Sequence, residues 1–137
     1  MRIVVKEPKE DIKIIETTKQ YRTECVKEII GEKYYLEYIT VTADEEHMLS
    51  LAVIEDGLMR ELPPNILIST TSPIFPIQIL VGPVVFVKTK YENAYIKDIW
   101  DFEVEDITDE DLELIKQMTD FKTQEVLFEA FKELQNK

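Results

Sequence analysis

The sequence predicts a single α+β domain: a twisted, mainly antiparallel or mixed sheet covered by one helix and followed by two C-terminal helices. The length of 137 residues suits one hydrophobic core. The chain is 45% apolar and 32% charged, which is typical of a globular protein. Short β-rich runs dominate its first two thirds, and helical periodicity marks both flanks. We expect residues 1–118 to form the α+β domain. Residues 119–137 should form an amphipathic helix that packs on this domain or mediates self-association.

The expected strands are short runs rich in β-branched and aromatic residues. They cover residues 2–6, 12–16, 34–41, 48–55, 66–70 and 84–90. Pro63 and Pro64 cannot both join a central ladder, so they should form a stiff, irregular connection. Pro73 and Pro76 are expected to bend the hydrophobic stretch that follows.

Three helices are expected from their caps and apolar periodicity. Thr17 or Thr18 should cap a helix over about residues 18–30. Thr108 is a good N-cap for the second helix, with an aspartate three residues later as a shortened capping box. Asp120 should cap the third. The apolar stripe of this last helix consists of Leu127, Phe128, Phe131 and Leu134.

Several kinds of chemistry are excluded by composition. The chain has only three glycines, so it has no glycine-rich phosphate loop. Cys25 is the only cysteine and His47 the only histidine, which excludes an intramolecular disulfide, a cysteine-based zinc site and a two-histidine metal site. A catalytic pair of Cys25 and His47 is disfavoured, because Cys25 falls on the apolar face of a helix. We therefore expect no metal and no cofactor, and an enzyme is the less favoured class.

The net charge of −12 disfavours direct binding of nucleic acid or of an anionic membrane. No window reaches the roughly 18–20 apolar residues that a spanning helix needs. The chain begins like a strand and not like a leader segment, and its lone thiol suits a reducing compartment. We expect a cytoplasmic protein of a bacterial host cell.

The one unusual charge feature is an acidic segment, residues 98–115, which holds nine carboxylates and no basic residue. Phe102 and Val104 should point inward there, leaving a row of carboxylates outward on a short strand. Carboxylates about 7 Å apart along one strand face roughly match the spacing of DNA phosphates. The residues expected to bind a basic partner are Asp101, Glu103, Glu105, Asp106, Asp109 and Glu110. The plainer alternative is a solvated acidic face that only improves solubility.

Three short motifs carry a resemblance to a known family. They are Gly57-Leu58 with Leu62-Pro63-Pro64-Asn65, then Gly82-Pro83-Val84-Val85-Phe86-Val87, then Asp106-Ile107-Thr108-Asp109-Glu110-Asp111. Over about residues 1–118 the chain resembles a family of small proteins, known as a domain of unknown function, that is common in phages and mobile elements of Gram-positive bacteria. The resemblance implies such a setting and a cytoplasmic location. It assigns no catalytic residue.

The sequence therefore leaves two hypotheses about the function of this protein. The first is a non-enzymatic phage or mobile-element accessory protein whose acidic surface binds a basic host protein that handles nucleic acid, as a mimic of DNA would. The second is a small-ligand-binding or enzymatic domain with a loop formed by Pro63, Pro64, Asn65 and Gly82. A homodimer through the C-terminal helix is left open.

Overall fold

A computed structural model describes residues 1–96 and 99–136 and shows eight strands and three helices in an α+β arrangement. The strands are β1 (Arg2–Lys6), β2 (Lys13–Glu16), β3 (Leu36–Ala43), β4 (His47–Ile54), β5 (Pro64–Ser69), β6 (Ile77–Val81), β7 (Val84–Ile96) and β8 (Ile99–Glu105). The helices are α1 (Arg22–Ile30), α2 (Asp109–Thr119) and α3 (Phe121–Gln135).

The main sheet has the strand order β2-β1-β7-β4-β3, and β8 pairs with the second part of β7. Every strand pair in it is antiparallel, which confirms the expected sheet type. β7 is the central strand because its run of Val84–Val87 is buried on both faces. β5 and β6 form a separate two-stranded ribbon.

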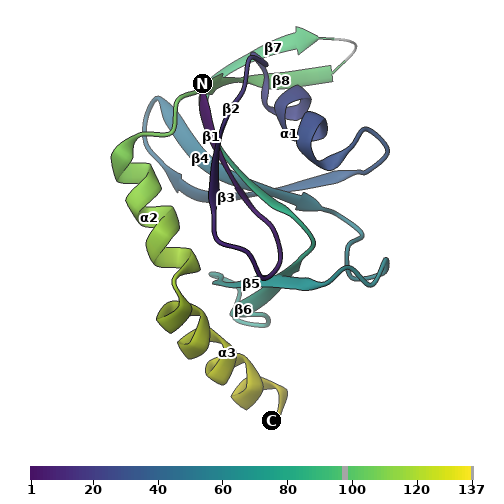
Figure 1. Cartoon of the computed structure of the whole chain (residues 1–137), viewed down its shortest axis with the longest axis vertical. Helices are drawn as coiled ribbons and strands as arrows, with labels where there is room; N and C mark the ends of the chain where they lie inside the picture. Colours follow the sequence, from purple (N-terminus) through teal and green to yellow (C-terminus); the bar gives the residue numbers. More distant parts are fainter. Residues whose placement is uncertain (97–98, 137) are drawn as a thin grey trace.

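Helices lie on opposite sides of the main sheet (Figure 1). α1 covers the face that carries Val85 and Val87, where Cys25 and Val26 complete one core cluster. α2 and the β5–β6 ribbon cover the other face, around the fully buried Phe86. α3 follows α2 along the same side and continues past the ribbon to the C-terminus (Figure 1). None of the described helices is long and apolar enough to cross a membrane.

The caps of the two C-terminal helices are those expected. Thr108 and Asp111 form a reciprocal capping box at the start of α2. The carboxylate of Asp120 accepts the backbone N–H of Lys122 at the start of α3. These caps were predictable because each depends on residues two or three positions apart.

The expected start of the first helix is wrong. α1 begins at Arg22 after Tyr21, which has no side-chain capping bond, and neither threonine caps it. The hydroxyl of Thr17 instead accepts the N–H of Lys19 in the preceding turn. The N–H of Thr23, in the first turn of α1, donates instead to the carboxylate of Asp101 in β8.

Two differences concern the proline-rich middle of the chain. β6 was not expected, because Pro76 and Gly82 frame its five residues so closely that the stretch looks irregular in isolation. β5 begins at Pro64, inside the connection expected to be irregular. A proline is tolerated there because it stands at the start of a strand, where no ladder donor is needed.

Candidate functional site

The acidic segment includes all of β8, a short connection and the first turns of α2. Of its nine carboxylates, Asp98 lies outside the described residues. The remaining ones do not form one outward row, because Asp101 and Asp111 are buried and Glu103 and Glu105 are half-buried.

Asp101 is buried, with 2% of its surface exposed, so the expectation that it points outward is wrong. Its carboxylate accepts the backbone N–H of Thr23 at 3.0 and 3.1 Å, and the N–H of Phe102 at 3.0 Å. Thr23 stands in the first turn of α1, whose own N-cap residue makes no side-chain bond. Asp101 therefore caps α1 from β8, across 78 residues of sequence.

Arg22 belongs to the same region and has a structural role. Its guanidinium lies 3.7 Å from the ring centroid of Tyr38 and 4.7 Å from that of Phe102. It also donates to the hydroxyl of Ser50 at 3.4 Å. Burial lowers the pKa of Arg22, and Tyr38 and Asp101 oppose this effect. This cation fixes α1 on the sheet and points to no ligand.

Arg2 neutralises part of the connection between β8 and α2. Its backbone N–H donates to Asp106 at 2.7 Å, and its guanidinium pairs with Asp109 at 3.3 Å. The same guanidinium donates to the carbonyl of Ile107 at 2.6 Å. Nearby, Glu105 pairs with Lys90 at 2.9 Å. Asp106 and Asp109 are exposed, but they also tie β1 to the start of α2.

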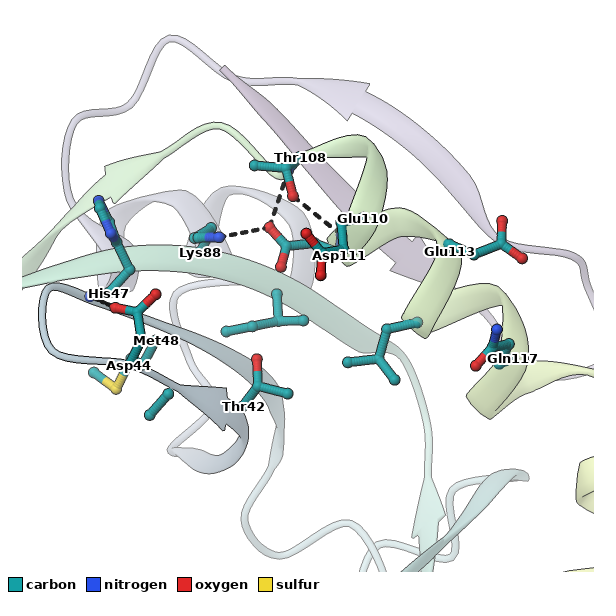
Figure 2. Close-up of a pocket in the computed structure, with 13 residues that line it drawn as sticks. Thr42, Asp44, His47, Met48, Lys88, Thr108, Glu110, Asp111, Glu113 and Gln117 are labelled. Carbon is teal, nitrogen blue, oxygen red and sulfur yellow. Dashed lines mark hydrogen bonds and ion pairs between the residues drawn. The ribbon is translucent and has the colours of Figure 1, made fainter.

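A cleft of about 580 Å³ lies between the β3–β4 turn, β7 and α2 (Figure 2). It is lined by the carboxylates of Asp44, Glu110, Asp111 and Glu113 and by two groups that can be cationic, Lys88 and His47. We call this feature the acidic cleft. Of the six residues expected to bind a basic partner, it contains Glu110 only.

Lys88 and Asp111 form the largely buried centre of the acidic cleft. Their ammonium and carboxylate are 2.8 Å apart, and the two side chains are 17% and 12% exposed. Burial on its own would raise the pKa of Asp111. The bonds from Lys88 and from the backbone and hydroxyl of Thr108 outweigh it, so this pKa lies below the usual range. The carboxylate of Asp111 neutralises the ammonium of Lys88, so this pair adds no net positive charge to the cleft.

The remaining walls of the acidic cleft are negative. Glu110 and Glu113 are exposed on α2, and Asp44 stands on the opposite wall (Figure 2). The N–H groups of Glu46 and His47 donate to Asp44 and hold its pKa below the usual value. Within the described ranges, neither glutamate forms an ion pair within 4.0 Å. The cleft can attract a cationic group.

The structure does not bring Cys25 and His47 together. Cys25 is fully buried in the core beneath α1, and this burial raises the pKa of its thiol. His47 lines the acidic cleft on the other face of the sheet. Among the described residues, no group of three or more histidine, cysteine, aspartate or glutamate side chains is placed to hold a metal ion.

The structure brings together Asn65 and Gly82 of the expected ligand loop. The amide of Asn65 donates to the carbonyls of Lys6 and Gly82 at 2.6 and 2.8 Å, and its oxygen accepts from the Lys6 ammonium at 3.1 Å. The N–H of Gly82 donates to the carbonyl of Pro63 at 2.8 Å. These bonds join the ribbon to β1 and engage both the nitrogen and the oxygen of the Asn65 side-chain amide.

Pro64 and Asn65 also border a groove of about 500 Å³ between the ribbon and α3. Its other wall includes Phe121 and Phe128, which are 78% and 48% exposed. Pro63 and Gly82 do not line this groove.

Sequence reasoning missed Lys88 and Gln124. Lys88 follows a run of buried residues in β7, and a lysine at the end of such a run was the available signal. Gln124 donates to the carbonyls of Leu67 and Met118, and it accepts the N–H of Leu67. Nothing local distinguishes this glutamine, because its partners are 57 and 6 residues away.

Comparisons with protein-family models, with curated proteins and with solved structures find no match for this chain.

Proposed function

We propose that this protein is a non-enzymatic accessory protein of a phage or mobile element, and that it acts by binding a basic protein that handles nucleic acid. The observation that carries the proposal is the acidic cleft, where Glu110, Glu113 and Asp44 face solvent around a charge-balanced centre. The phage or mobile-element setting rests on the sequence resemblance alone.

The six carboxylates expected to bind a partner differ in their burial. Asp101 is buried and caps α1, so it is removed from the proposed surface. Glu103 and Glu105 are half-buried, while Asp106, Asp109 and Glu110 are exposed. A lysine or arginine of the partner would be attracted to Glu110 and Glu113, and this attraction should weaken as salt rises.

The test is a pull-down from host lysate at low salt with the tagged protein and its Glu110→Gln/Glu113→Gln variant. The proposal expects a basic nucleic-acid-handling protein that is released by added duplex DNA or by salt, and that the variant does not retain. The matched control is Glu125→Gln/Glu129→Gln, which removes the same charge from α3. Binding that ignores salt, or that both variants retain equally, would refute the proposal.

A second candidate is a small-ligand-binding or enzymatic domain, favoured by the groove beside Pro64 and Asn65. Its volume of about 500 Å³ lies in the range of small-molecule sites. A metabolite that raises the melting temperature of the wild type but not of Phe128→Ala would support it. Asn65→Ala is a poor test, because it would separate the ribbon from β1.

A further inference from the structure

The strand edges of this protein are covered to different extents. β2 is four residues long and begins with a lysine. At β5, the Gln124 amide bonds both the N–H and the carbonyl of Leu67, as a neighbouring strand would. At β8, the N–H of Val104 donates to the carbonyl of Gln20. Short strands, charged ends and covering segments are the ordinary ways to protect an edge from pairing.

β3 is the opposite edge of the main sheet, and among the described strands it pairs with β4 alone. Its eight residues contain no lysine, arginine or proline, and none of them is buried. A bulge at Thr40–Thr42 disturbs only its C-terminal part. The regular part of this edge therefore spans Leu36–Thr40.

The backbone groups that β3 presents outward can be assigned. The N–H of Glu55 donates to the carbonyl of Tyr35 at 2.9 Å, so this pair faces inward, toward β4. Hydrogen-bonded and non-bonded pairs alternate along an antiparallel ladder. Leu36, Tyr38 and Thr40 therefore direct their N–H and carbonyl groups away from β4. An extended segment can pair with all of these alternating donors and acceptors at once.

The surroundings of the edge specify the side chains of such a segment. A groove of about 310 Å³ borders Ile39 and Val41, with Leu114 and Met118 of α2 and Leu127 of α3 on its other side. None of the described residues that line it is charged, although 32% of the chain is charged. Side chains of an added strand that face this groove should be apolar.

Exposed carboxylates lie near both ends of the edge, and Lys33 is an exposed cation before its start. Glu37 is exposed near the start of β3, and Asp44, Glu45 and Glu46 are exposed just beyond its end. A cationic residue at either end of the added strand would be paired there. The net charge of −12 on each copy opposes a second copy of this chain as the occupant.

We propose that the outer edge of β3 accepts an extended segment of a partner protein as a further antiparallel strand, apolar at its centre and basic at its ends. The antiparallel direction continues the pattern of the sheet. This proposal shares with the proposed function the need for a protein partner and one residue, Asp44, but it does not use Glu110 or Glu113.

The probe is the acetylated and amidated peptide Lys-Thr-Val-Thr-Val-Thr-Lys, with hydrogen exchange followed by NMR. In the free protein the amides of Leu36, Tyr38 and Thr40 should exchange faster than those of Glu37 and Ile39, which face β4. Bound peptide should protect the three outward amides by at least about tenfold.

Two N-methylated peptides of the same charge serve as controls. In antiparallel addition the threonines lie opposite Leu36, Tyr38 and Thr40, so methylating the threonine amides should abolish binding. Methylating the valine amides should leave binding intact, since those N–H groups point to solvent. Equal binding of all three peptides, or no binding of the parent peptide, would overturn the proposal.

The matched protein variant is Thr40→Pro, which removes one outward N–H and leaves the bonds to β4 in place. It should bind the peptide about tenfold more weakly while keeping the melting temperature of the wild type. A concentration-dependent dimer that protects the same three amides without peptide would also overturn the proposal. Retention of peptide binding by Glu110→Gln/Glu113→Gln distinguishes this surface from the acidic cleft.

Discussion

Replacing Asp101 by alanine tests whether β8 supplies the cap of α1. The substitution removes a buried charged acceptor and leaves the N–H of Thr23 without its partner. Losing an N-cap costs about 0.5–2 kcal/mol, and a hydrogen bond to a charged group contributes about 1.5–3 kcal/mol. We expect Asp101→Ala to lower the free energy of unfolding by about 2–3 kcal/mol. Asp101→Asn keeps one acceptor oxygen and should cost about 1 kcal/mol.

Urea unfolding at pH 7, followed by far-UV circular dichroism, measures both values. In a chain of this length, the alanine variant should also melt about 8 °C lower. Glu103→Ala is the control, because Glu103 lies two residues away on the same strand and is only half-buried. It should change the free energy of unfolding by less than about 0.5 kcal/mol. Equal stability of Asp101→Ala and Glu103→Ala would refute the capping role.

Three further predictions follow from other contacts. The folded state lowers the pKa of Asp111, so the stabilising effect of this carboxylate should be complete above about pH 5 and lost as the pH falls below about 4. The difference in free energy of unfolding between wild type and Asp111→Asn, measured in urea, should therefore shrink as the pH falls. A difference that stays constant would contradict the pairing with Lys88. Gln124→Ala leaves both edge groups of Leu67 unpaired and should cost about 2 kcal/mol in urea, against less than about 0.5 kcal/mol for an exposed neighbour on α3. Gly82 has φ +72°, and a Cβ there would lie 2.9 Å from the side chain of Leu62. Gly82→Ala should therefore lower the free energy of unfolding by about 1–3 kcal/mol. An unchanged melting temperature would contradict this backbone assignment.

The fold class was predictable because its signals are local. The cap at Thr108 and the Tyr21–Ile30 periodicity each depend on residues within one or two helical turns. β6 was missed because Pro76 and Gly82 at its ends are strong breakers, and the pairing with β5 that makes it a strand is not local. Tertiary context therefore decided the one strand that local chemistry disfavoured.

The candidate site was less predictable, because the alternation of apolar and acidic residues along a strand does not show which acidic side chain is buried. Alternation along β8 placed Asp101 outward with Glu103. The need of α1 for a cap explains its inward position, and that need is visible only once β8 and α1 are adjacent. The acidic cleft likewise depends on the β3–β4 turn lying opposite α2, about 65 residues further along the chain.

The described aspartates of the acidic segment have a different role from the two glutamates that line the acidic cleft. The four described aspartates all accept hydrogen bonds: Asp101 from the first turn of α1, Asp111 from the N-cap N–H of α2, Asp106 from a backbone N–H, and Asp109 from a guanidinium. A short side chain suits this work, because its oxygens stay close to the backbone. The longer Glu110 and Glu113 extend from α2 into the acidic cleft. Converting every carboxylate of the segment to an amide would therefore confuse unfolding with lost binding, whereas the glutamates alone test recognition. Retained binding after loss of both glutamates, in a variant of unchanged stability, would leave the negative charge of this segment with a structural role only.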